Sequence, residues 1–499
     1  MRKSIAPAWG ALASVCLGGT AWFLSRAPYA PTFDDAWYLE TSFRLFSALR
    51  DGPFTFARAY ADALHIKAPL IALIPFPLYA LFGMSERAAL WTGPALAAWT
   101  AWSVRKIARR LHGPAAGDAA GALTLAIPLL YGLSRVFFVE TLLTALVSAT
   151  ISAILDARPG RRADAVRLGA LVGLGLLAKS IFPIYIVLPL WLRRRELKPG
   201  APLAFAVAAA VAGTWYAFNL PYVIGFGFSA GFGRIARDYG PASALAPAAL
   251  WGYARGVIGD GLSWPLAAAG ALTFILARQA NVAPEARRLE FAWAAPLALF
   301  FLGVNKEIRY SLPVLPVFAV ATAGAWSRLS GRARTAAGAI LAAAALWVYG
   351  GQTFGAPPAA PLAYNGPTRS AGWDRGALVD ALARAAGPDS VAAIALEHPA
   401  MNANTVASCA AARGLRWKTV SLGYAQPDAE SALIRLKDKN ADLLVLFNGV
   451  AEAELPAFLN RANAGVAAAI ASGRLSARRV EEVAVWPGVT AVVWALARR

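Results

Sequence analysis

The chain has 499 residues, of which 58% are hydrophobic and only 15% are charged. This composition excludes an ordinary soluble enzyme and is typical of a protein that crosses a membrane many times. The formal net charge is +20, but it does not indicate nucleic-acid binding, because the basic residues occur in short clusters between apolar segments.

Apolar segments long enough to cross a bilayer recur along residues 1–350. We therefore predict a polytopic α-helical membrane protein with about eleven transmembrane helices. The first apolar segment is longer than the core of a typical signal peptide, and further spans follow it, so we interpret it as an uncleaved helix. The predicted helices cover residues 6–25, 88–105, 115–133, 139–156, 165–179, 181–193, 201–220, 250–277, 290–305, 311–327 and 335–350.

The loops between these helices fall into two classes by charge. One class is rich in Lys and Arg and poor in acidic residues. It includes residues 105–110, 158–167, 193–198, 278–288 and 328–334. The positive-inside rule places these loops in the cytoplasm. We therefore expect a multi-pass protein of the inner (plasma) membrane, with its N-terminus in the cytoplasm and its C-terminal region outside.

This orientation makes residues 27–87 a long first outer loop. Within it, "HIKAPLIALIPFPLYALFG" (65–83) is long enough to be a span. Counting it as one would place the basic segment "VRKIARR" outside. We therefore expect a helix that lies on the outer membrane surface and is broken by Pro69, Pro75 and Pro77.

The same loop begins with two adjacent acids, Asp34 and Asp35, in "PTFDDAWYLE". Neighbouring carboxylates repel each other and are costly to desolvate near a bilayer, so they indicate a functional site. Asp35 either orients Asp34 or shares a divalent metal ion with it, and the sequence leaves both open. Tyr38 is expected to be an interfacial aromatic residue, although a sugar can also stack on such a ring.

Further polar residues occur at the predicted outer ends of helices. In one interpretation, each cation extends to the lipid headgroups or forms a structural ion pair. In the other, these polar residues together form one pocket that binds an anionic lipid phosphate beside a catalytic carboxylate. A lone histidine is more often a hydrogen-bonded structural residue than a ligand. These residues are His65, Lys67, Arg135, Glu140, Lys179, Lys306, Arg309 and Tyr310.

The composition changes after Gly351. Residues 351–370 contain the Pro/Gly-rich segment "GAPPAAPLAYNGPTRS" and are interpreted as a linker. In residues 371–499, short β-like segments alternate with helical ones, which predicts a soluble α/β domain with a mostly parallel sheet. Strands are predicted at 390–396, 417–423, 441–449 and 478–488, with "TAVVWALA" as an edge strand, and helices at 402–414, 428–439 and 456–473.

The order of these motifs resembles that of the GT-C membrane glycosyltransferases, in the branch of protein O-mannosyltransferases and lipid A aminoarabinose transferases. The motifs are "DDAWYLE", "KAPL", "SRVFFVETLLT", "GLGLLAKSIFP" and "NKEIRYSLPVLP". The resemblance covers about residues 1–350. It implies transfer of a sugar from a polyprenyl phosphate to a lipid, glycan or protein acceptor at the outer membrane face.

The resemblance also implies roles for single residues. Asp34 takes the position of the catalytic acid, Lys67 and Lys179 approach the lipid phosphate, and the basic pair before the Tyr-x-x-Pro run is Lys306 and Arg309. The sequence departs from its relatives in two places: Asp35 stands where Glu is common, and Ala68 stands where many relatives have Pro. The substrate therefore remains open.

Two other classes of function compete with this one. A transporter or flippase of a lipid-linked sugar would share the apolar content and the basic pockets, but the sequence has no internal repeat and its charges cluster at one face. A ligand sensor would need far fewer spans than predicted here. We therefore expect a polyprenyl-phosphate-dependent, inverting glycosyltransferase, with residues 1–350 as its catalytic domain.

Overall fold

The computed structural model describes residues 6–26, 29, 31–231, 233, 241, 243–278, 282–355, 372–387, 389–422, 428–450 and 461–497. Most of the predicted linker 351–370 is outside these ranges. The chain forms two compact units. The first contains Met1–Ala27, Ala57–Ile74 and Leu90–Gly366, and the second contains Pro28–Phe56, Pro75–Ala89 and Pro367–Arg499. The sequence assigned the two loop segments of the second unit to the membrane domain, whereas the structure packs them with the C-terminal residues.

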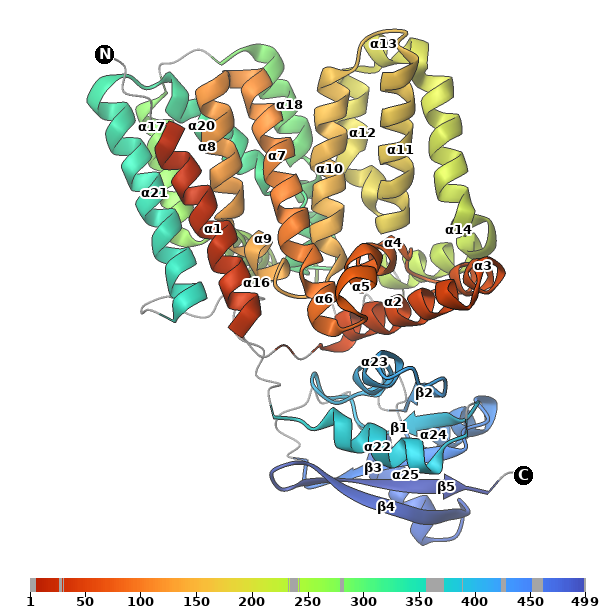
Figure 1. Cartoon of the computed structure of the whole chain (residues 1–499). Helices are drawn as coiled ribbons and strands as arrows, with labels where there is room; N and C mark the ends of the chain where they lie inside the picture. The colour runs from red at the N-terminus through yellow and green to blue at the C-terminus, as the bar shows by residue number, and fades with distance from the viewer. Residues whose placement is uncertain are drawn as a thin grey trace. The chain divides into compact units, whose positions relative to one another are not determined.

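The first unit is a bundle of helices, most of which run side by side (Figure 1). Many of them begin at or next to a proline, whose fixed φ suits the first helical position and whose missing N–H is not needed there. The long helices are α1 (Ala6–Arg26), α7 (Thr92–His112), α8 (Pro114–Leu125), α10 (Val139–Asp156), α11 (Arg162–Ala178), α12 (Phe182–Leu192), α14 (Ala201–Gly231), α17 (Trp264–Leu276), α18 (Pro284–Ala294), α20 (Pro316–Arg328) and α21 (Gly331–Phe354). The shorter elements are α4 (Leu70–Leu73), α9 (Pro128–Leu133), α13 (Arg194–Leu197), η1 (Lys198–Gly200), α16 (Pro247–Arg255), η2 (Gly256–Leu262), α19 (Pro296–Leu302) and η3 (Ile308–Ser311).

By length and composition, four helices in the described part of the chain can cross a membrane, or up to five if a bent pair is one span. The bent pair is Pro247–Leu262 with Trp264–Leu276, which meet at 90°. Two other predicted spans, 115–133 and 290–305, are each divided into two helices. The second helix of each pair begins at a proline, Pro128 in α9 and Pro296 in α19. The structure therefore supports a mostly helical membrane protein, and the count of about eleven spans stays a prediction.

Helix α10 is the centre of this bundle. Almost all of its residues are buried, and α7, α11 and α12 pack around it. Helix α11 packs against α14 through Gly169 and Gly173, where an added Cβ would meet Ala204, Val207 or Val211. Small residues four apart let two helix backbones approach closely, which is a common packing mode in membranes.

The second unit combines helices of the first loop with the C-terminal α/β domain. The loop helices are α2 (Phe33–Asp51), α5 (Phe76–Phe82) and most of α6 (Glu86–Leu90), while α3 (Pro53–Ala61) joins the two units. The predicted surface helix 65–83 is thus divided into α4 and α5, with the break at Pro75. The C-terminal helices are α22 (Arg375–Ala385), α23 (Ala403–Ala412), α24 (Ala429–Asp438) and α25 (Arg461–Ala471).

The C-terminal domain contains a mixed five-stranded sheet in the order β2-β1-β3-β5-β4 (Figure 1). Its strands are β1 (Val391–Ile394), β2 (Lys418–Ser421), β3 (Leu443–Asn448), β4 (Ala477–Trp486) and β5 (Val489–Leu496). Strand β1 is parallel to β2 and β3, whereas β5 is antiparallel to both β3 and β4. The prediction of a mostly parallel sheet is therefore wrong. The predicted edge strand "TAVVWALA" is interior, because the β4–β5 hairpin pairs with β3 through its second strand.

The sheet is covered on both faces. Helices α22 and α23 pack with one set of inward residues, including Ile394, Val445 and Val493. Helices α24 and α25 pack with the alternate set, including Ala393 and Leu444. Successive side chains of a strand point to opposite faces, which explains why neighbouring residues of β1 belong to different cores.

Candidate active site

A buried carboxylate with two cations lies at the start of α10 in the first unit. Glu140 is 0% exposed, and its Oε1 atom lies 2.6 Å from Lys179 Nζ and 3.7 Å from Arg309 Nε. The side chains of Lys179 and Arg309 keep 20% and 19% of their exposure. The cluster thus has one negative charge inside, two positive charges nearer the surface, and a net charge of one positive unit.

Two of these charged side chains, Glu140 and Lys179, are positioned by the ends of helices. Glu140 lies in the first turn of α10, where the helix dipole stabilises an anion. Lys179 immediately follows α11, whose C-terminus favours a cation. Helices α10 and α11 pack against each other, so the two ends bring opposite charges together.

Aromatic rings support the two cations. Lys179 Nζ lies 4.3 Å from the centre of the Tyr310 ring, and the Arg309 guanidinium lies 5.0 Å from the Phe138 ring and 5.5 Å from the Tyr310 ring. The Tyr185 hydroxyl donates to the Tyr310 carbonyl at 2.8 Å, which anchors η3. Such cation–π contacts orient a cation while its outer N–H groups remain able to bind an anion.

The segment before Lys67 has a strained backbone. Leu64 and His65 have φ values of 59° and 45°, in the left-handed region that non-glycine residues rarely adopt. Helix α14 holds this segment: His65 Nδ1 lies 2.8 Å from Asn219 Oδ1, and Trp215 Nε1 donates to a carbonyl of the segment at 3.0 Å. His65 therefore has a structural hydrogen bond, and a catalytic or metal-binding role for it stays a prediction.

Arg135 belongs to a second buried cluster. It is 4% exposed, and its Nη2 donates to Thr353 Oγ1 at 2.6 Å. Its guanidinium lies 4.4 Å from the Phe23 ring, 4.8 Å from the Tyr131 ring and 5.4 Å from the Tyr349 ring. The structure therefore gives Arg135 aromatic and hydroxyl partners from α1, α9 and α21.

Lys306 also has partners of its own. Its ammonium donates to the Phe301 carbonyl and lies 5.7 Å from the rings of both Tyr253 and Phe301. Two of the predicted phosphate-binding cations, Lys179 and Arg309, share the Glu140 carboxylate.

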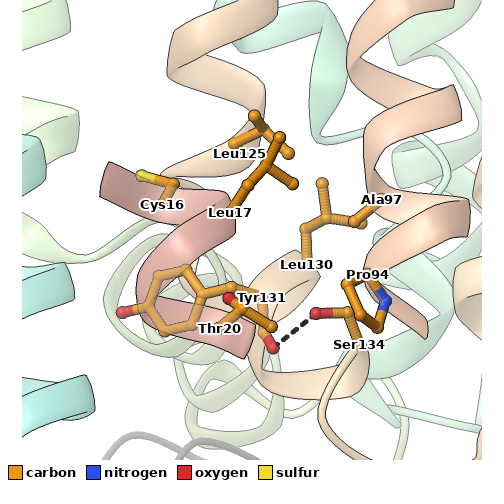
Figure 2. Close-up of a pocket in the computed structure, with 9 residues that line it drawn as sticks. All are labelled: Cys16, Leu17, Thr20, Pro94, Ala97, Leu125, Leu130, Tyr131 and Ser134. Atoms are coloured by element: carbon orange, nitrogen blue, oxygen red, sulfur yellow. Dashed lines mark hydrogen bonds between the residues drawn. The ribbon is translucent and has the colours of Figure 1, made fainter. Parts of the chain in front are cut away.

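A small cavity lies near the Arg135 cluster (Figure 2). Its volume of about 10 Å³ has room for roughly one water molecule, so it is too small for a sugar or a lipid phosphate. Figure 2 shows the Ser134 hydroxyl beside the Tyr131 carbonyl, to which it donates at 2.8 Å. The lining residues are Cys16, Leu17, Thr20, Pro94, Ala97, Leu125, Leu130, Tyr131 and Ser134.

The two neighbouring aspartates lie in the first turn of α2. Asp35 is 2% exposed and reaches back over the helix start. Its Oδ1 accepts hydrogen bonds from Thr32 N at 2.6 Å, Thr32 Oγ1 at 2.9 Å and Ala36 N at 3.1 Å, while its Oδ2 accepts one from the Tyr29 hydroxyl at 2.8 Å. Burial raises the pKa of Asp35 to about 7, although these hydrogen bonds act in the opposite direction.

The two aspartates differ in their contacts and in their burial. The Asp35 carboxylate completes a capping box with Thr32, so it stabilises the helix start. Asp34 is only partly buried on the same turn, and its role as the catalytic acid stays a prediction. Both belong to the second unit and the cations belong to the first, so their meeting in one cavity stays a prediction.

One expectation for this region needs correction. Tyr38 is 3% exposed, so its ring is packed inside the protein rather than in an exposed interfacial belt. Both Asp35 oxygens accept hydrogen bonds, which agrees with a role in holding the helix start, and a divalent ion shared by Asp34 and Asp35 stays a prediction. No group of three or more His, Cys, Asp or Glu side chains suited to a metal ion occurs in the described ranges.

Comparisons with known proteins identify similar membrane glycosyltransferases. Residues 66–218 match the family model for dolichyl-phosphate-mannose-protein mannosyltransferase. ArnT from Cupriavidus metallidurans, solved alone and with undecaprenyl phosphate, is similar over 98% of this chain and 98% of its own, with a TM-score of 0.65 and 16% identity. The chain has the GT-C membrane glycosyltransferase fold.

A second similarity agrees with this GT-C fold. The oligosaccharyltransferase AglB from Archaeoglobus fulgidus, in complex with a peptide and dolichol phosphate, is similar over 88% of this chain and 69% of its own, with a TM-score of 0.55 and 13% identity. No curated protein matches the sequence. Sequence reasoning for this GT-C chain missed Phe138, Tyr185 and Asn219, because single aromatic or amide residues within apolar helices carry no local signal of a contact far along the chain.

Proposed function

We propose that this protein transfers a sugar from a polyprenyl-phosphate donor to a lipid, glycan or protein acceptor at the outer face of the inner membrane. The net positive cluster of Glu140, Lys179 and Arg309 carries this proposal. Within this cluster two cations face one buried carboxylate, and such an excess of cations suits a lipid phosphate. The mannosyltransferase match and the likeness to ArnT bound to undecaprenyl phosphate support the same donor class.

The mechanism follows from the chemistry of the donor. Asp34 accepts the proton of an acceptor hydroxyl as its oxygen attacks the anomeric carbon, a contribution of ~10²–10⁴-fold. The bond from that carbon to the phosphate oxygen breaks, and the polyprenyl phosphate leaves with the electron pair. Lys67, Lys179 and Arg309 stabilise the charge on the leaving phosphate. Direct displacement inverts the anomeric centre.

The proposal includes the orientation of the chain. About eleven spans place the N-terminus in the cytoplasm and the α/β domain outside. An outer site has no supply of nucleotide sugars, so a donor that arrives in the lipid is required.

A radiolabelled donor tests the function. The full-length protein in proteoliposomes, given a polyprenyl phosphate that carries a labelled sugar, should release free polyprenyl phosphate and transfer the label to an acceptor. Asp34→Asn should abolish this release while donor binding persists. Movement of intact donor between leaflets without release would identify a flippase instead, and unchanged turnover of Asp34→Asn would reject Asp34 as the base.

A further inference from the structure

Helix α2, which carries Asp34, is packed against the C-terminal domain. The partner is α23, and both helices belong to the second compact unit (Figure 1). Through α23, the domain therefore contacts the helix whose first turn carries the two aspartates.

One side chain of the domain reaches the first turn of α2. Asn404 Nδ2 donates a hydrogen bond to the carbonyl oxygen of Phe33 at 3.1 Å. Phe33 is the residue immediately before Asp34. Asn404 is itself held at the start of α23, where Asn402 and Thr405 form a capping box and the Asn402 side chain accepts from Asn404 N at 2.9 Å.

A second set of contacts holds the other half of α2. Arg44 Nη2 donates to the Trp417 carbonyl at 3.0 Å, and Arg44 Nε is paired with Glu40 at 2.7 Å. Arg416 lies 3.7 Å from Asp51, at the C-terminal end of α2. The domain thus contacts α2 at its first residue, at Arg44 and at its last residue.

We propose that the C-terminal domain positions the catalytic acid, and that Asn404 is the positioning residue for Asp34. This inference rests on the proposed function. The capping box of Thr32 and Asp35 fixes the helix start locally, but it does not fix where that start lies in space. Asn404 supplies this tertiary constraint one residue from Asp34. A displacement of about 1 Å at a reacting group can reduce a rate by up to ~10²-fold.

The test is a double-mutant cycle in the full-length protein. Asn404→Ala removes the hydrogen bond, and we expect kcat to fall by ~10-fold with an unchanged dissociation constant for undecaprenyl phosphate. Asn404→Gln keeps an amide donor and should recover part of the rate. Asn463→Ala is the matched control, because it removes an amide that bonds to the Phe447 backbone inside the same domain. The control should retain the wild-type kcat.

The second arm separates positioning from loss of folded enzyme. Asp34→Glu keeps the acid but displaces it by one methylene, so Asn404→Ala should cost less than about twofold in that background. An equal loss in both backgrounds, or full activity of Asn404→Ala, would overturn the positioning role. If Asn404→Ala is fully active while Asp34→Asn is inactive, only this inference fails. Wild-type turnover of Asp34→Asn would reject the proposed function and this inference together.

Discussion

Residues with the same charge have different environments in this protein. Lys179 pairs with a buried carboxylate, whereas Arg135 is surrounded by aromatic rings and a threonine hydroxyl. The sequence places both at the predicted outer ends of helices. Their partners, and not their type or position, therefore decide which of them can hold a phosphate.

Loss of Lys179 should affect both binding and stability. Lys179→Met removes a charged contact of ~1.5–3 kcal/mol, so we expect donor affinity to fall by about 10-fold or more. It also leaves the Glu140 carboxylate buried beside one more distant cation, which is destabilising. The double variant Glu140→Gln/Lys179→Met should recover thermal stability but not affinity. Donor binding is measured by titration, and its recovery in the double variant would contradict the phosphate role of Lys179. Lys198→Met, which changes an exposed lysine, is the control.

Two buried carboxyl groups make the second unit sensitive to pH. Burial raises the pKa of Glu397 from 4.5 to about 7, and it raises that of Asp35 from 3.8 to about 7. The folded state therefore holds protons that the unfolded state releases. The contribution of these two groups to stability is fully present below their unfolded pKa values and is lost as the pH rises through about 7.

Glu397→Gln should therefore make the unfolding temperature of the second unit less dependent on pH. We expect the variant to unfold at a higher temperature than the wild type at pH ~8 and to differ little near pH ~4. Asp35 supplies the dependence that remains. Thermal scans from pH ~4 to ~8 provide the measurement, and a wild-type slope in the variant would show that Glu397 does not titrate in this range.

At the scale of elements, glycines decide how closely helices approach. Gly169 of α11 faces α14 so closely that a Cβ atom would collide with the Ala204 carbonyl, whereas a Cβ at Gly213 of α14 meets nothing within 4 Å. The same residue type is thus needed for packing at one position and is only a weak helix former at the other.

Alanine substitutions at these two glycines should have opposite effects. Gly169→Ala should destabilise the protein by ~1–3 kcal/mol, because overpacking forces α11 away from α14. Gly213→Ala should be neutral or stabilising by up to ~1 kcal/mol, because alanine favours the helix. Thermal unfolding in detergent compares the two. Equal effects would mean that the α11–α14 contact is looser than described.

At the scale of the whole molecule, the two units are built from alternating stretches of chain. The first loop contributes α4 to the first unit and α2 and α5 to the second. The orientation of the chain in the membrane is predicted from its basic loops.

Reporter fusions test that orientation. A reporter inserted after Leu197 is expected to face the cytoplasm, because the surrounding loop is rich in arginine. One inserted after Phe354 is expected to face outside. Alkaline phosphatase activity and cytoplasmic fluorescence distinguish the two sides. The reverse pattern would place Asp34 in the cytoplasm and remove the proposed site.

Sequence reasoning located most elements of the fold. The predicted span 139–156 coincides with α10, and the five predicted strand segments contain β1 to β5 almost in full. It failed where the order of strands matters, since "TAVVWALA" has the same alternation whether it lies at an edge or inside a sheet. It also failed where proline interrupts a long apolar segment, as between α8 and α9.

The sequence by itself determined the membrane character, the helices and strands, and the set of ionisable residues, because hydrophobicity and periodicity are local properties. Only the tertiary structure decided that Lys179 and Arg309 share Glu140, that Asp35 caps a helix, and that α2 packs against α23 of the C-terminal domain. Most of these contacts join residues far apart along the chain. No short stretch of sequence specifies which distant partner a charge will meet, since that depends on how all the helices pack.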